Sequence, residues 1–162
     1  MTIKIVYGNL LENSVGAEAL AHGVNCEGVM GAGIAFQFRN EFPLMYETYK
    51  HLCSAGMTPG YSCLVWDNKK DKDDPKKIKT TSIFLLTTQL KIGANAKIEY
   101  VTNSLLDMKR QANATGISSI AIPKIGCGIG GLNFKNVLYE TVRIFAPWHG
   151  TLCVYLLSEK EY

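Results

Sequence analysis

The stretch Gly23–Phe38, GVNCEGVMGAGIAFQF, decides the fold. The apolar run Ala19–Val24 leads into it and predicts a strand, and Ile34–Arg39 can continue as a helix. Between them lie three glycines within six residues: Gly28, Gly31 and Gly33. Glycine lets a backbone approach a ligand closely, and the first turn of a helix carries unpaired N–H groups with a partial positive charge. This order favours a phosphate or pyrophosphate site, although a turn that only packs would have the same pattern.

A second stretch, Ile120–Leu132, repeats this order with the sequence IAIPKIGCGIGGL. The strand-like run Ile117–Ile122 enters a loop with four glycines, and the helical run Phe134–Phe145 follows it. Two such units predict two loops that face one anionic ligand across the carboxyl ends of neighbouring strands. Neither loop has the lysine of a P-loop, and neither has the glycine spacing and acid of a dinucleotide-binding fold.

Three stretches resemble the macrodomain, an ADP-ribose-binding module: His22–Phe38 (HGVNCEGVMGAGIAFQF), Ile122–Phe134 (IPKIGCGIGGLNF) and Ile5–Leu11 (IVYGNLL). The resemblance covers nearly the whole chain. It is greatest to the branch that holds the terminal ADP-ribose glycohydrolases, the DNA-ADP-ribose-removing antitoxins and the ADP-ribose-1″-phosphate phosphatases. It implies one domain over residues 1–162, with ADP-ribose or ADP-ribosylated molecules as partners and no cofactor or metal.

The hydrophobic pattern predicts six strands and four helices. The expected strands are Ile3–Tyr7, Ala17–Val24, Tyr61–Trp66, Ser82–Thr88, Ile117–Ile122 and Leu152–Leu157. The expected helices are Ile34–Phe42, Leu44–Ala55, Ala96–Thr115 and Phe134–Phe145. Strands alternate with helices in the second half, which predicts an α/β fold with a mixed, mostly parallel sheet covered on both faces. The resemblance implies the same architecture, a three-layer α/β/α sandwich.

Composition excludes several classes of protein. A chain of 162 residues with 47% hydrophobic and 19% charged residues fits one globular domain with a core. The net charge of +3 comes largely from the segment Asp67–Lys79, which we expect to be a solvated hairpin or loop, so no strong nucleic-acid surface is predicted. Five scattered cysteines predict reduced thiols in a cytoplasmic protein. No signal peptide or membrane span is visible, and the sequence does not predict the oligomeric state.

The resemblance assigns ligand contacts to the start of the chain and to both glycine loops. The expected ligand-binding residues are Asn9, Leu10, Asn25, Gly28, Val29, Met30, Gly31, Ala32, Gly33, Ile34, Pro123, Ile125, Gly126, Cys127, Gly128, Ile129, Gly130 and Gly131. The Asn25 amide either bonds a ribose hydroxyl or starts the loop as an Asx turn. Cys26 has no His–acid partner at a local spacing, so we interpret it as a packing residue.

His22 is the candidate catalytic residue. The phosphatase branch of the resembling family has a histidine at the matching place, and Asn9 matches a Gly-Asn of that branch. A histidine with a pKa near neutrality can act as a base or nucleophile on a phosphoryl group. The alternative is a core histidine whose nitrogens are bonded to the backbone.

The sequence departs from the glycohydrolase pattern at two positions. Those enzymes use a lysine after the strand that ends here at Thr88 and an aspartate in the second glycine loop, where this chain has Gln89 and Gly130. Lys91 lies two residues beyond the lysine position. We therefore expect lysine–aspartate chemistry to be absent. Three functions remain: a phosphatase on ADP-ribose-1″-phosphate, which is favoured, a glycohydrolase acting on modified protein or DNA, and a non-catalytic reader of ADP-ribose.

Overall fold

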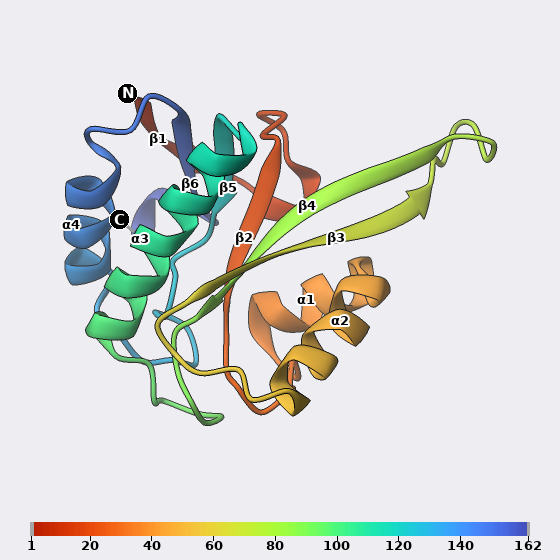
Figure 1. The fold of residues 1–162 in the computed structure, drawn as a ribbon. Coiled ribbons are helices and arrows are strands. Elements are labelled where there is room, and N and C mark those ends of the chain that lie inside the picture. The colour runs from red at the N-terminus through yellow and green to blue at the C-terminus, as the bar shows by residue number, and fades with distance from the viewer. Residues whose placement is uncertain (1, 162) are drawn as a thin grey trace.

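The computed structural model describes residues 2–161 and places a six-stranded sheet between two pairs of helices (Figure 1). The strands are β1 (Thr2–Tyr7), β2 (Ala19–Val24), β3 (Ser62–Lys70), β4 (Ile78–Thr87), β5 (Ser119–Ile122) and β6 (Thr151–Leu156). The helices are α1 (Gly33–Glu41), α2 (Pro43–Ser54), α3 (Ile98–Thr115) and α4 (Phe134–Phe145), with short 3₁₀ turns at Leu10–Glu12 and Glu159–Glu161. No helix in this part of the chain is long and apolar enough to cross a membrane.

The strand order is β1-β6-β5-β2-β4-β3, and every neighbouring pair is parallel except β3 and β4. The expected mixed, mostly parallel sheet is therefore confirmed, with edge strand β3 as its antiparallel member. Because the other five strands run in one direction, their carboxyl ends meet at a single edge of the sheet. The loops that follow these strands share that edge.

The helices cover the two faces of the sheet in pairs, which confirms the expected three layers (Figure 1). In β4, Phe84 and Leu86 pack in the cluster that contains α3 and α4, whereas Ile83 and Leu85 pack in the cluster that contains α1 and α2. All four side chains are fully buried. A continuous apolar run of this kind is typical of a strand that is buried on both faces.

The strands β3 and β4 extend well into the charged segment that separates them. The sequence predicts that β3 ends at Trp66 and that the next strand begins at Ser82, but antiparallel pairing continues from Trp66↔Ser82 out to Lys70↔Ile78. The expected solvated hairpin is present, and it projects beyond the helical layers (Figure 1). We call residues 66–82 the arm.

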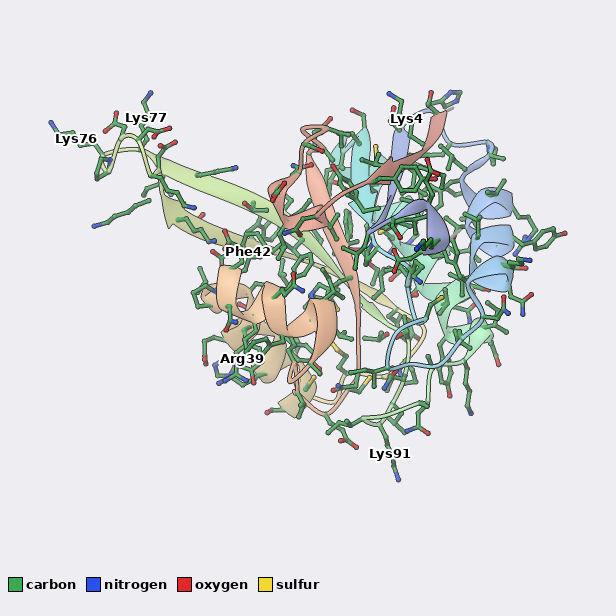
Figure 2. The ribbon with its side chains drawn as sticks, turned by 180° about the vertical axis from the view of Figure 1, so that it is seen from behind. Lys4, Arg39, Phe42, Lys76, Lys77 and Lys91 are labelled. Atoms are coloured by element: carbon green, nitrogen blue, oxygen red, sulfur yellow. The ribbon has the colours of Figure 1, made fainter. Side chains whose placement is uncertain are left out.

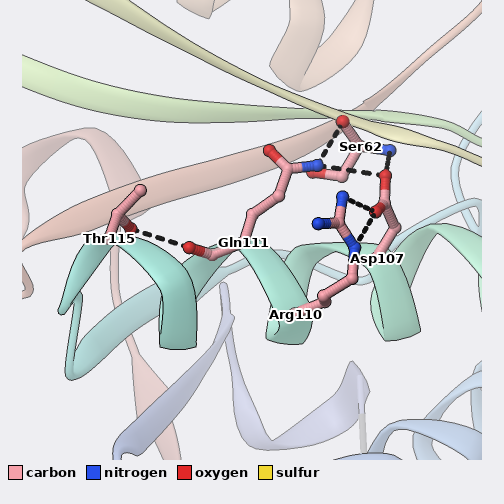
Figure 3. Close-up of polar contacts among 5 residues, drawn as sticks. All are labelled: Ser62, Asp107, Arg110, Gln111 and Thr115. Atoms are coloured by element: carbon pink, nitrogen blue, oxygen red, sulfur yellow. Dashed lines mark hydrogen bonds and ion pairs between the residues drawn. The ribbon is translucent and has the colours of Figure 1, made fainter.

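Side chains of helix α3 form hydrogen bonds with the beginning of edge strand β3 (Figure 3). The Ser62 N–H donates to Asp107 Oδ2 at 2.9 Å, and Gln111 Nε2 donates to the Ser62 carbonyl oxygen at 2.6 Å. Gln111 Nε2 also lies 3.0 Å from Asp107 Oδ2, and Arg110 Nη2 donates to Asp107 Oδ1 at 2.7 Å. These side chains satisfy main-chain groups that an edge strand otherwise leaves unpaired.

Candidate functional site

A cavity of about 240 Å³ lies at the carboxyl edge of the sheet, between the loops that follow β2, β4 and β5. It is lined by Gly23, Val24, Asn25, Val29, Gly31, Ala32, Gly33, Ile34, Ala35, Thr88, Gln89, Ile92, Gly93, Pro123, Lys124, Ile125, Gly126, Gly128, Ile129 and Gly130. The two glycine loops therefore face one cavity, as their position after neighbouring parallel strands predicts.

The first wall is the loop between β2 and α1, which the Asn25 side chain holds in shape. Its Oδ1 accepts from the Glu27 N–H at 2.9 Å, and its Nδ2 donates to the Val29 carbonyl oxygen at 2.8 Å. The Tyr49 hydroxyl donates to Asn25 Oδ1 at 2.7 Å and to the Asn25 carbonyl oxygen at 2.8 Å. Asn25 thus forms the Asx turn that the sequence left as an alternative, and it also lines the cavity.

The first turn of α1 forms part of the same wall. Its N-cap residue, Ala32, has no side chain that can accept from the first turn. Gly33, Ile34 and Ala35 all line the cavity. Main-chain N–H groups of a first helical turn that lack a capping side chain provide donors and a partial positive charge for an anion.

The second wall is the loop between β5 and α4. Gly126 adopts a φ of +72°, and the loop closes through the Leu132 N–H, which donates to the Gly126 carbonyl oxygen at 3.0 Å. Asn133 then caps α4 by accepting from the Lys135 N–H at 2.9 Å. Glycine is required at Gly126 because this φ is costly for residues with a Cβ.

The loop between β4 and α3 forms a third wall that the glycine motifs do not reveal. Gln89 Nε2 donates to the carbonyl oxygens of Lys91 and Gly93 at 2.6 and 2.8 Å, which fixes the turn after β4. The Ala96 N–H donates to the Gly130 carbonyl oxygen at 3.3 Å and joins this loop to the second wall. Gln89 therefore acts as a structural amide at the cavity wall.

Lys124 is the one ionisable side chain among the described residues that line the cavity. Its ammonium group lies 3.4 Å from a carboxylate oxygen of Glu161. The described residues that line the cavity include no carboxylate, and the Glu161 carboxylate is paired with Lys124. Burial raises the pKa of the nearby Cys26 thiol to about 11, with a further contribution from Cys53 and Cys63. Cys26 is therefore protonated near neutrality, which agrees with the predicted packing role.

The structure does not bring His22 to the cavity. Its side chain is fully buried and stacks on Phe38 of α1, with ring centroids 4.1 Å apart. Neither ring nitrogen has a hydrogen-bond partner among the described residues. Burial lowers the pKa of His22 to about 3. The geometry is that of a core histidine, although without the backbone bonds expected for one, and it gives no support to the predicted catalytic role.

Twelve of the predicted ligand-binding residues line the cavity: Asn25, Val29, Gly31, Ala32, Gly33, Ile34, Pro123, Ile125, Gly126, Gly128, Ile129 and Gly130. Six do not: Asn9, Leu10, Gly28, Met30, Cys127 and Gly131.

The reasons for these six differ. Leu10 and Met30 are buried in the hydrophobic core. Asn9 follows β1 at the same edge of the sheet, where its side chain accepts from the Leu11 N–H. Gly28 and Gly131 have positive φ, and Cys127 packs against the hydrophobic core.

The residues that the sequence analysis missed are Gly23, Val24, Ala35, Thr88, Gln89, Ile92, Gly93 and Lys124. Gln89 was noted only as a departure from the glycohydrolase pattern. Four of the eight follow β4: Thr88, Gln89, Ile92 and Gly93. The strand order could have revealed these four residues, because β4 is a parallel neighbour of β2 and its carboxyl end must lie at the same edge of the sheet.

Known proteins resemble this chain over most of its length. The Macro domain family model matches residues 21–139. A DNA ADP-ribosyl glycohydrolase of Mycobacterium tuberculosis is 34% identical over 141 residues, which are 87% of this chain and 38% of that protein. An ADP-ribose 1″-phosphate phosphatase of Lodderomyces elongisporus is 27% identical over 146 residues, which are 84% of this chain and 88% of that protein. The macrodomain of Mycobacterium tuberculosis DarG superposes with a TM-score of 0.82 and 31% identity, covering 97% of this chain and 99% of that one.

Proposed function

We propose that this chain, which belongs to the Macro domain family, binds ADP-ribose groups in the cavity between its glycine loops. The observation that carries the proposal is the cavity lining. It combines the uncapped first turn of α1 with a glycine-rich loop on the opposite side and contains no carboxylate among the described residues. Main-chain donors without a competing negative charge suit a diphosphate.

The substrate class that we favour is ADP-ribose attached to DNA. The similarity to a DNA ADP-ribosyl glycohydrolase supports this choice, because 87% of this chain aligns with it. This chain spans about 38% of the length of that relative, so the activity of the whole relative is carried over here only as a proposal.

The second candidate function is hydrolysis of the bond between ADP-ribose and DNA. In that reaction water attacks C1″ of the distal ribose, the bond from C1″ to the base breaks, and the base nitrogen takes up a proton. Gln89 is neutral and Gly130 has no side chain, so neither supplies a proton or accepts one. We expect hydrolysis by this site to be slower than the ~1 s⁻¹ of ordinary enzymes.

A phosphatase reaction on ADP-ribose-1″-phosphate is the weaker candidate. The similarity to a named phosphatase is 27%, and the residue that would carry the chemistry, His22, stacks on Phe38 away from the cavity. The sequence favours a phosphatase. We now favour recognition of ADP-ribose instead.

Calorimetric titration with ADP-ribose tests binding, with AMP as a control that lacks the distal ribose and its phosphate. We expect one site for ADP-ribose and at least about tenfold weaker binding of AMP. Absence of heat with ADP-ribose at about 1 mM, which corresponds to roughly −4 kcal/mol, would overturn the proposal.

Incubation of the protein with three substrates separates recognition from catalysis. The substrates are an ADP-ribosylated DNA oligonucleotide, a protein carrying ester-linked ADP-ribose, and ADP-ribose-1″-phosphate. Binding without release supports a reader, whereas release of ADP-ribose from DNA alone supports the second candidate. Rapid release of phosphate from the third substrate would contradict the choice made here.

A further inference from the structure

The arm has two unlike faces. Alternate side chains of a strand point to opposite faces, and directly paired residues of an antiparallel ladder share a face. One face carries Asp67 and Lys69, and the other carries Trp66, Asn68 and Lys70 with their partners on β4. The two faces meet very different surroundings.

The first face is anchored to the helices beneath it. Asp67 is buried, and its Oδ2 accepts from the Met45 N–H in the first turn of α2 at 2.9 Å. The Lys69 ammonium lies 2.6 Å from Glu41 Oε1 and 4.6 Å from the ring centroid of Phe42. These contacts hold the arm against α1 and α2, so the other face of the arm has a fixed position.

The second face, which we call the bare face, is exposed. It carries an aromatic, a polar and a basic side chain in a line. Trp66 is 54% exposed and Ile78, opposite Lys70, is 70% exposed. Between them Thr80 Oγ1 donates to Asn68 Oδ1 across the strands at 2.8 Å. At ~3.3 Å per residue, the alternate positions 66, 68 and 70 lie about 7 Å apart. An aromatic ring, polar groups and an ammonium group therefore follow one another along the face.

The tip of the arm is positively charged. Five lysines are exposed on the arm: Lys70, Lys72, Lys76, Lys77 and Lys79. The aspartates Asp71 and Asp74 are half-buried and accept main-chain N–H groups of the turn, which leaves Asp73 as the exposed acid of the arm. Figure 2 shows Lys76 and Lys77 at the far end of the hairpin.

We propose that the bare face of the arm binds single-stranded nucleic acid. Aromatic side chains on which bases stack, beside cations that follow the backbone, are the features by which proteins hold single strands without sequence preference. The charge of the exposed side chains is complementary to phosphate. The sequence sets six lysines of the arm against four aspartates. In the fold five of these lysines are exposed, whereas Asp67 is buried and Asp71 and Asp74 are half-buried.

A second copy of this chain is a less suitable occupant. Edge strand β3 has a free side, but lysines at Lys69 and Lys70 disfavour pairing with another strand. A Trp66-dependent dimer in sedimentation would therefore count against the nucleic-acid proposal.

The surface is separate from the cavity. The tip lies at the beginning of β4 and the cavity at its end, roughly 30 Å apart over ten residues. Trp66 pairs with Ser82, five residues or about 17 Å before the end of β4. Figure 2 shows Lys91, beside the cavity, on the far side of the molecule from Lys76 and Lys77. Unmodified oligonucleotide is expected to bind whether or not the cavity holds ADP-ribose, so this proposal and the proposed function can fail separately.

Tryptophan fluorescence gives a direct test with unmodified oligothymidylate and oligouridylate of about 20 nucleotides. The chain has two tryptophans, the exposed Trp66 and the buried Trp148. Stacking on Trp66 is expected to quench its emission at low salt, and saturating ADP-ribose is expected to leave the quenching unchanged. Trp66→Phe is expected to remove the quenching, because Trp148 is shielded.

Matched variants separate the arm from general charge attraction. Trp66→Ala is expected to weaken binding of oligothymidylate roughly tenfold, whereas Tyr139→Ala, at an exposed aromatic residue on α4, is expected to change it by less than about twofold. Lys76→Gln with Lys77→Gln is expected to make the slope of log K against log salt shallower by about 1.4, at about 0.7 per lost phosphate contact. The control pair, Lys4→Gln with Lys135→Gln, is expected to leave that slope unchanged.

The outcomes that overturn the proposal are specific. They are no quenching at low salt, equal loss of binding in arm and control variants, and competition between oligonucleotide and ADP-ribose for one site.

Discussion

Gly130 and Gln89 face each other at the wall of the cavity. A Cβ atom on Gly130 would lie 3.1 Å from Gln89 Oε1, 2.6 Å from the Gly126 carbonyl oxygen and 2.8 Å from the Ala96 Cβ atom. The position that the family resemblance assigns to an aspartate is therefore closed to any side chain here. The two departures from the lysine–aspartate pattern are neighbours in space, and they fit one another sterically.

Gly130→Ala is expected to destabilise the protein by about 1–3 kcal/mol, because the added methyl group overlaps the Gly126 carbonyl oxygen and the Ala96 Cβ atom, neither of which can rotate away. Urea unfolding measures this change. Gly128→Ala is the matched control, since a Cβ atom there meets no heavy atom within 4 Å and its cost should stay within about 0.5 kcal/mol. Equal losses in the two variants would contradict the steric argument.

Gly128→Val is expected to separate binding from folding. The side chain enters free space in this structure, but that space belongs to the cavity. We expect ADP-ribose affinity to fall at least about tenfold, or 1.4 kcal/mol, while the free energy of unfolding changes little. Calorimetry and urea unfolding on the same preparation provide the comparison, and parallel losses would indicate a packing role for Gly128.

The sequence predicts the parts of this molecule that depend on local patterns. Helix α4 begins and ends where its periodicity indicates, at Phe134 and Phe145, and both glycine loops line one cavity. These features need only the order strand, glycine loop, helix and the rule that parallel strands end at one edge.

The rest depends on pairing and packing that no local pattern records. The strands of the arm extend through a lysine-rich run because a partner strand satisfies the backbone of both, which overrides the low strand propensity of Lys and Asp. Gln89 lines the cavity through a loop without a motif. His22 faces Phe38 because strand side chains alternate, whereas Asn25 lies beyond the end of β2.

Asp107→Ala is expected to destabilise the fold by about 1–3 kcal/mol, because the Ser62 N–H loses its acceptor and Gln111 loses one partner. The matched control is Glu47→Ala. Glu47 pairs with Lys50 on the surface of α2 and is 57% exposed, so its removal should cost less than about 0.5 kcal/mol. Urea unfolding of both variants measures the difference, and a cost for Asp107→Ala no larger than that of the control would contradict the anchoring role.

His22 is expected to make stability depend on pH. Its pKa is about 3 in the folded protein and 6.5 in the unfolded chain, so between these values the unfolded state binds a proton that the folded state does not. The contribution of the neutral ring to stability is complete above pH 6.5. It is lost as pH falls toward 3, with a slope of up to about 1.4 kcal/mol per pH unit. Urea unfolding at several pH values between 5 and 7.5 measures this slope.

His22→Leu provides the decisive comparison for that slope. Leucine keeps an apolar contact with Phe38 and removes two ring nitrogens that have no hydrogen-bond partner among the described residues. We expect a shallower dependence of stability on pH, a fold retained at pH 7 and unchanged ADP-ribose affinity. His149→Gln, at an exposed histidine, is the matched control. If His22→Leu folds but loses ADP-ribose affinity or catalytic turnover, the histidine serves the ligand, and the assignment of His22 to the core is wrong.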